Sequence, residues 1–106
     1  MDIQLKKGVL EYCLLHCIAQ KESYGYDLLK QVSECFPDIQ ESTIYAILRR
    51  LKANHMTETY EGNVSGGPVR KYYRITEQGK STLQQMEKDW RDLVWAVEKM
   101  CKGKEE

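Results

Sequence analysis

The sequence lacks net charge and long apolar runs, and each absence narrows the range of possible functions. Its 106 residues carry 16 basic and 16 acidic side chains, whereas a strongly basic balance is the usual electrostatic signature of a nucleic-acid-binding domain. No stretch is apolar enough to span a bilayer, and the N-terminal residues do not resemble a cleavable signal. We therefore expect a cytoplasmic protein, with a nucleic-acid partner only if its basic residues are concentrated locally.

The sequence also lacks the usual signatures of a metal site, a disulfide scaffold or an enzyme. None of the four cysteines forms a C-x-x-C pair, and all coincide with apolar helical positions, which predicts reduced thiols in the core. Cys13, His16 and Cys17 share a helix face, but their spacing is wrong for most zinc sites and no second ligand pair follows. No nucleophile elbow or phosphate-binding loop occurs. We expect no metal, no cofactor and no enzymatic activity.

What the sequence does have is a basic middle segment. Residues 1–41 hold four basic and seven acidic side chains, a net charge of −3, whereas residues 42–76 hold six and two, a net charge of +4. Residues 77–106 return to −1, with six basic and seven acidic side chains. Because phosphate contacts act locally, a neutral protein with one basic face can still bind DNA.

The order of the predicted elements indicates a mostly α member of the α+β class. Helices are predicted at residues 4–20, 23–36 and 41–54, and strands at residues 56–60 and 69–76. Ser23 is the predicted N-cap of the second helix, and Pro37 ends it. A trihelical core followed by a hairpin and a last helix is a winged helix-turn-helix. We assign residues 1–76 to this DNA-binding domain and residues 77–106 to a dimerisation helix.

The outward face of the third predicted helix carries what a recognition helix needs. Ser42, Thr43 and Tyr45 lie near its N-terminus, where base edges come within reach in the major groove. Cations follow at the positions where phosphates run, namely Arg49, Arg50 and Lys52. Taken alone, this helix is equally compatible with an ordinary solvated face of an amphipathic helix.

The second predicted strand favours the DNA-binding interpretation. It follows a glycine-rich turn at residues 65–68 and alternates two kinds of side chain. We assign Val69, Tyr73 and Ile75 to the core. The other face and the tip are basic or aromatic, with Arg70, Lys71, Tyr72 and Arg74 as predicted DNA contacts. Arg70 and Lys71 are the predicted phosphate clamp that holds each subunit in register.

The last helix has the apolar spacing of a coiled-coil seam, which predicts a homodimer. Its members are Leu83, Met86, Trp90, Leu93, Val97 and Met100, separated by 3, 4, 3, 4 and 3 residues. Such a helix must pack on something, and a two-fold-related copy is the simplest partner. The two recognition helices would then lie about 34 Å apart and bind a palindrome-like operator.

Three blocks of this sequence resemble the PadR family of bacterial transcriptional regulators. They are Tyr24-Gly-Tyr-Asp-Leu-Leu29, Thr43-Ile-Tyr-Ala-Ile-Leu-Arg-Arg-Leu51 and Arg70-Lys-Tyr-Tyr-Arg-Ile-Thr-Glu-Gln-Gly79. The resemblance implies a winged-helix dimer that represses detoxification or efflux genes and is released by a small molecule, which we expect to be an aromatic or phenolic ligand. It further implies that Tyr45 contacts a backbone phosphate. The single helix after the hairpin is similar to the small PadR subfamily.

This chain departs from the PadR pattern in the third helix. Ala46 stands where the family often has proline, and Asn54-His55 where it often has a glycine that ends the helix. We expect Asn54 to take the left-handed conformation of that glycine.

Trp90 has two interpretations, filling of the dimer core or stacking on a flat aromatic effector. The resemblance to multidrug-sensing members of the small subfamily supports the second, with Met86 and Leu93 beside Trp90 in a central pore.

Three other functional classes remain open. They are a protein-interaction winged helix, a double-stranded RNA binder and a thiol-based redox regulator acting through Cys101.

Overall fold

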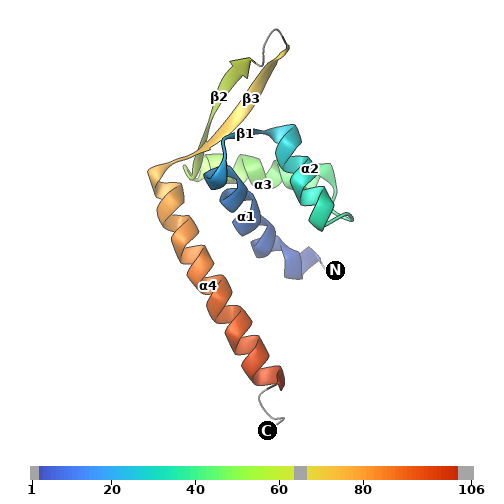
Figure 1. The fold of residues 1–106 in the computed structure, drawn as a ribbon, viewed down its shortest axis with the longest axis vertical. Helices are drawn as coiled ribbons and strands as arrows, with labels where there is room; N and C mark the ends of the chain where they lie inside the picture. Colours follow the sequence, from blue (N-terminus) through green and yellow to red (C-terminus); the bar gives the residue numbers. More distant parts are fainter. Residues whose placement is uncertain (1–2, 64–66, 103–106) are drawn as a thin grey trace.

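In the computed structural model, which describes residues 3–63 and 67–102, helices pack around one core and a small sheet covers one end of it (Figure 1). The helices are α1 (Ile3–Gln20), α2 (Gly25–Cys35), α3 (Glu41–Ala53) and α4 (Glu77–Lys102), and the strands are β1 (Ser23–Tyr24), β2 (Thr57–Asn63) and β3 (Val69–Ile75). The sheet is antiparallel with strand order β1-β3-β2. The predicted mostly helical α+β fold is confirmed. Ser65 and Gly66 of the predicted glycine-rich turn lie outside the described residues.

The core forms where the apolar stripes of α1, α2 and α3 meet. Leu14, Leu28, Ile44 and Leu48 are fully buried there, and Tyr73 of β3 closes one side. Burying a leucine or isoleucine side chain contributes roughly 1.5–3 kcal/mol, so these stripes fix how α3 sits on α1 and α2. Within the described residues, no helix is both long and apolar enough to cross a membrane.

Ser23 does not cap α2, contrary to the sequence prediction. It lies in β1 opposite Tyr73 of β3, and its hydroxyl donates to the carbonyl of Lys21 at 2.9 Å. Tyr24 takes the N-cap position of α2 in extended conformation, and its backbone pairs with Tyr72. The pairing with β3 supplies hydrogen-bond partners for the backbone of β1, and it adds a third strand to the predicted hairpin.

The end of α3 is closed by His55 and not by Asn54. Asn54 has φ −90° and ψ 12°, whereas His55 has φ 63°. The amide of His55 donates to Lys52 O and the amide of Met56 donates to Leu51 O, both at 3.0 Å, which is a Schellman motif. The motif places the left-handed residue one position before Met56, whose side chain packs on the core.

The first turn of α4 is bonded directly to this end of α3. Thr76 caps α4 because its Oγ1 accepts a hydrogen bond from the amide of Gly79 at 2.9 Å. The same hydroxyl donates to His55 O at 2.7 Å, and the amide of Thr76 donates to Met56 O at 3.0 Å. A Cβ on Gly79 would lie 2.1 Å from Met56 O, so only glycine permits this approach. α4 is therefore attached directly to the end of α3 as well as to β3.

Beyond its first turns, α4 projects away from the core. The molecule measures 62 × 30 × 22 Å, with the hairpin at one end of the long axis and the end of α4 at the other (Figure 1). Leu83 and Met86 are partly covered, but Trp90, Leu93 and Met100 are exposed by 39%, 55% and 82%. The predicted seam thus leaves the core as an uncovered apolar face.

Candidate nucleic-acid interface and effector groove

The outward face of α3 is open at the positions predicted for base and phosphate contacts. Ser42, Ala46, Arg49 and Lys52 are exposed, because the buried residues of α3 all point to the other side. Thr43 is partly buried.

Tyr45 is partly buried because it packs over the N-terminus of α2. A Cβ on Gly25 would lie 3.1 Å from its Cε1, so glycine makes room for the ring. Burial raises the pKa of Tyr73, the neighbouring Tyr45 raises it further, and Arg49 lowers it.

Arg50 is oriented differently from its neighbours on α3. Its Nη2 and Nε donate to Oε2 of Glu11 on α1, at 2.9 Å and 3.2 Å. Arg50 therefore links α3 to α1 by an ion pair at the surface of the helical core. Glu11 is 39 residues away from Arg50 in the sequence, and no sequence pattern indicates that the two side chains pair.

A row of tyrosines crosses the outer face of the sheet. The ring centroids of Tyr24 and Tyr72 are 5.8 Å apart and those of Tyr72 and Tyr60 are 5.5 Å apart. Gly62 permits the row, because a Cβ there would lie 2.9 Å from the Tyr72 ring. Tyr60 also donates a hydrogen bond to Glu22, and this bond is the main reason why the pKa of Tyr60 is raised. The aromatic character of Tyr72 was expected from the sequence, but Tyr24 and Tyr60 were not predicted as its neighbours.

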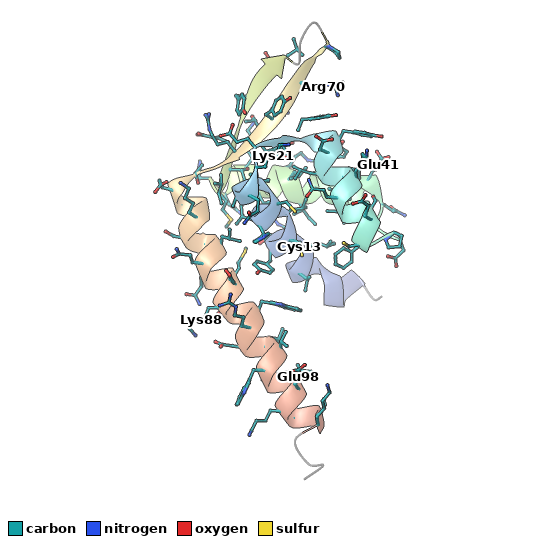
Figure 2. The ribbon with its side chains drawn as sticks, viewed as in Figure 1. Cys13, Lys21, Glu41, Arg70, Lys88 and Glu98 are labelled. Atoms are coloured by element: carbon teal, nitrogen blue, oxygen red, sulfur yellow. The ribbon has the colours of Figure 1, made fainter. Side chains whose placement is uncertain are left out.

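Two of the predicted hairpin cations lie against this row. The Arg70 guanidinium lies 4.6 Å from the Tyr24 ring centroid, and that of Arg74 lies 4.9 Å from Tyr60 and donates to Glu58 at 3.0 Å. Figure 2 labels Arg70 on the projecting hairpin, beyond the helical core. Lys71 is exposed and, by strand alternation, lies on the opposite face from Arg70. The hairpin thus presents cations on both faces.

Val69 and two cysteines are more exposed than the sequence predicted. Val69 is 59% exposed, because the hairpin projects past the core before its inner face is covered at Tyr73. Cys35 and Cys101 are exposed, so only Cys13 and Cys17 are half-buried thiols.

The half-buried thiols line a cleft between α1 and α2 of about 240 Å³, together with His16 and Cys35. Burial raises the pKa of both, and neighbouring thiols raise it further. Among the described residues, no three histidine, cysteine or carboxylate side chains are grouped so as to hold a metal ion.

A second surface feature is a groove of about 370 Å³ between α1 and α4. Its walls combine apolar, aromatic and acidic side chains, namely Gly8, Val9, Glu11, Tyr12, Met86, Asp89, Trp90 and Leu93. The predicted effector residues Trp90, Met86 and Leu93 are thus brought together. Tyr12, Glu11 and Asp89 were not predicted, because the sequence does not show which face of α1 meets α4.

A trihelical core whose third helix exposes a polar face, beside a hairpin that carries cations, defines a winged-helix DNA-binding protein. The family model described as "Transcriptional regulator PadR-like family" matches residues 14–85. The chain belongs to the PadR family of transcriptional regulators, as the three sequence blocks suggested.

Solved structures and a protein sequence support the assignment over nearly the whole chain. A PadR-like transcriptional regulator from Bacillus cereus is 35% identical, with a TM-score of 0.87 and coverage of 95% of this chain and 99% of that one. A Streptococcus transcriptional regulator is 37% identical, with a TM-score of 0.86 and coverage of 93% and 98%. An uncharacterised protein of Lysinibacillus sphaericus is 35% identical over 102 residues, 93% of this chain and 94% of its own length.

Proposed function

We propose that the protein is a homodimeric repressor that binds operator DNA and is released by a small aromatic cation in the α1–α4 groove. In this proposal residues 1–76 bind the operator and residues 77–106 form the dimer. One observation carries the proposal: α3 exposes a polar face, and α4 exposes a separate apolar face. The first face is suited to binding DNA and the second to forming a dimer.

The apolar face of α4 supports the dimer. Trp90, Leu93, Val97 and Met100 recur on one side of the helix, and each is between 39% and 82% exposed. Covering half of a large apolar side chain contributes on the order of 1 kcal/mol, and two-fold symmetry counts every residue twice. Trp95 lies on the opposite side of α4, where Lys99 covers its ring at 5.6 Å, so it is outside the proposed seam.

The DNA contacts follow from the geometry of α3 and the hairpin. Ser42, Thr43 and Tyr45 lie at the N-terminal end of α3, which enters the major groove in helix-turn-helix proteins. Arg49 and Lys52 extend the contact to phosphates. The hairpin residues Arg70, Lys71, Tyr72 and Arg74 then hold the neighbouring backbone, with Arg74 contributing least because Glu58 pairs with it. We leave Arg50 out of this interface because Glu11 binds it.

The groove chemistry favours a cation over a phenolate as effector. Glu11 and Asp89 supply carboxylates, Tyr12 and Trp90 supply rings, and no lysine or arginine is among its lining residues within the described chain. Rings attract cations through their π faces, and carboxylates add charge attraction. An anionic phenolate would meet repulsion from both carboxylates.

Operator binding is tested with the DNA upstream of the gene, first by protection mapping and then by fluorescence anisotropy over a salt series. Affinity should fall steeply with salt and exceed that for random duplex by at least about a thousandfold. Arg49→Ala should weaken binding to all duplexes alike and reduce the salt slope by about 1, because Arg49 is assigned to a phosphate. Lys80→Ala is the matched control, because Lys80 on α4 pairs with Glu77 away from the interface. A salt-independent affinity, or equal binding of random duplex, would show that the protein is not a sequence-specific DNA binder.

Hairpin and dimer contacts have their own tests. Arg70→Ala combined with Lys71→Ala should weaken all duplexes alike, because phosphate contacts carry no sequence information. Unchanged duplex binding by this double variant would remove the hairpin from the interface. Leu93→Glu combined with Val97→Glu should yield monomers in sedimentation analysis, since four carboxylates would meet at the seam, and a variant that stays dimeric would refute the seam.

Effector binding is tested with N-methylquinolinium, a small aromatic cation, and with uncharged quinoline as the matched probe. The cation should quench tryptophan fluorescence and release the operator, and quinoline should quench it only at higher concentration. Trp90→Ala should abolish the quenching, whereas Trp95→Phe should retain it. Release that is unchanged in Trp90→Ala would place the effector elsewhere.

A further inference from the structure

Glu11 belongs to the effector groove and to the support of the recognition helix at the same time. It lines the groove between α1 and α4 together with Trp90 and Asp89. Its Oε2 also accepts both hydrogen bonds from Arg50 in the last turn of α3. One carboxylate therefore faces the proposed ligand and holds the DNA-binding helix.

The environment of this ion pair makes its loss costly. The Glu11 side chain is 23% exposed and that of Arg50 43%, so both charges are partly withdrawn from water. Charge-assisted hydrogen bonds to arginine are stronger than neutral ones, and a partly buried charge that loses its partner is left uncompensated. The other carboxylate of the groove is different, because Asp89 accepts a hydrogen bond from Gln85 on its own helix.

We infer that Glu11 is the residue that recognises the positive charge of the effector, and that the effector acts by competing with Arg50 for this carboxylate. The inference rests on the proposed function. A cation seated between Tyr12 and Trp90 attracts the Glu11 carboxylate into the groove. Arg50 then loses its link to α1, and the last turn of α3 is no longer held at the orientation that fits the operator.

Loss of the Arg50–Glu11 ion pair affects the last turn of α3 and, through it, the base of α4. The Arg50 carbonyl accepts the amide of Asn54 at 3.0 Å, immediately before the Schellman motif that receives the hydrogen bonds of Thr76. A shift of this turn therefore changes both the outward face of α3 and the base of α4. By thermodynamic linkage, operator and cation must weaken each other by the same factor.

The chemistry also predicts a division between binding and release. An uncharged aromatic of similar shape still finds the rings and the apolar walls of the groove, but it offers Glu11 no charge and leaves Arg50 in place. Quinoline should therefore quench tryptophan fluorescence at higher concentration than N-methylquinolinium without releasing the operator even at saturation. Ligand charge, and not groove occupancy, is what the recognition helix responds to.

The deciding experiment measures operator affinity with and without saturating N-methylquinolinium, and cation affinity by tryptophan quenching, in the full-length protein. For the wild type we expect operator affinity to fall by about tenfold on cation binding. Arg50→Gln should bind the operator more weakly than the wild type, and the cation should lower that affinity by less than about twofold. This variant should also bind the cation about tenfold more tightly, because its Glu11 is free. Glu11→Gln should also lose the coupling but bind the cation more weakly.

Asp89→Asn is the matched control, since it removes a groove carboxylate that has no contact with Arg50 among the described residues. It should weaken cation binding and keep the tenfold coupling. Arg50→Lys, which retains the charge, should restore part of the coupling and guards against a folding defect in Arg50→Gln. Equal thermal unfolding midpoints of the variants confirm that the comparison is between folded proteins.

The outcomes separate this inference from the proposed function. If the wild type binds the operator and is released by the cation, but Arg50→Gln binds the cation with unchanged affinity, Arg50 acts on DNA directly and the competition is refuted. Full coupling in Glu11→Gln would refute it equally. If the wild type neither binds an operator nor responds to the cation, the proposed function fails and the inference fails with it.

Discussion

Gly79→Ala should destabilise the protein although alanine is the better helix former. The added Cβ would lie 2.1 Å from Met56 O, whereas an ordinary contact is about 3.5 Å, so the start of α4 must move by more than about 1 Å. This movement breaks the cap from Thr76 Oγ1 to the Gly79 amide, worth about 1 kcal/mol. It also breaks the bonds of Thr76 to Met56 O and His55 O, worth about 1 kcal/mol each. Replacing a helical glycine returns about 1 kcal/mol, which leaves a net loss of about 2 kcal/mol.

The assay is urea unfolding followed by circular dichroism, with all variants at one protein concentration because formation of the proposed dimer would contribute to stability. Gly8→Ala on α1 is the matched control. A Cβ there would meet no atom of the described residues within 4 Å outside its neighbours and its own helix backbone, so this variant should gain roughly 0.5–1 kcal/mol. Equal gains in Gly8→Ala and Gly79→Ala would refute the reasoning and show that the α3–α4 junction is not closely packed.

Three smaller effects follow from local geometry. His55→Gly should stabilise the protein by about 1 kcal/mol in urea unfolding, because glycine accepts a φ of 63° without strain. Thr57→Val should be neutral or stabilising by up to about 1 kcal/mol, because the buried Thr57 hydroxyl has no hydrogen-bond partner among the described residues; a loss would reveal a hidden partner. Iodoacetamide should modify exposed Cys35 before Cys13 and Cys17 at pH 7.5 in a mass-spectrometric time course, since burial raises the pKa of the latter two and lowers their thiolate fraction.

The helical core could be predicted because its signal is local. The apolar period in residues 4–20 and 41–54 fixes which faces are buried, and α1 and α3 end within one residue of the predicted positions. The family was also predictable, since its three sequence blocks lie in the part of the chain that the family model matches.

The errors arose where a distant residue decides the local structure. Ser23 has the chemistry of an N-cap, but its backbone pairs with Tyr73, which no local pattern reveals. Asn54 tolerates the left-handed conformation better than His55, yet the packing of Met56 on the core sets the position of the turn. The candidate site was predicted in outline, through the α3 face, the hairpin cations and Trp90. Glu11 and Asp89 were not predicted as part of the groove, because the sequence does not show that Glu11 lies beside α4 and Arg50. The assigned DNA contacts stay predictions.

The bonded junction at Thr76 turns α4 into a lever. Its 26 residues span about 39 Å, and if two such helices cross near their middle, as in the proposed dimer, each α3 lies about 20 Å from the pivot. A change of about 5° in the crossing angle would then shift the two α3 helices by roughly 2 Å relative to each other, about half of the 3.4 Å that separates one base from the next along a DNA strand. A change of about 10° would alter the spacing of the two α3 helices by a full base step. Because the base of α4 is bonded directly to the end of α3, such a change at the seam would put the proposed dimer out of register with its operator.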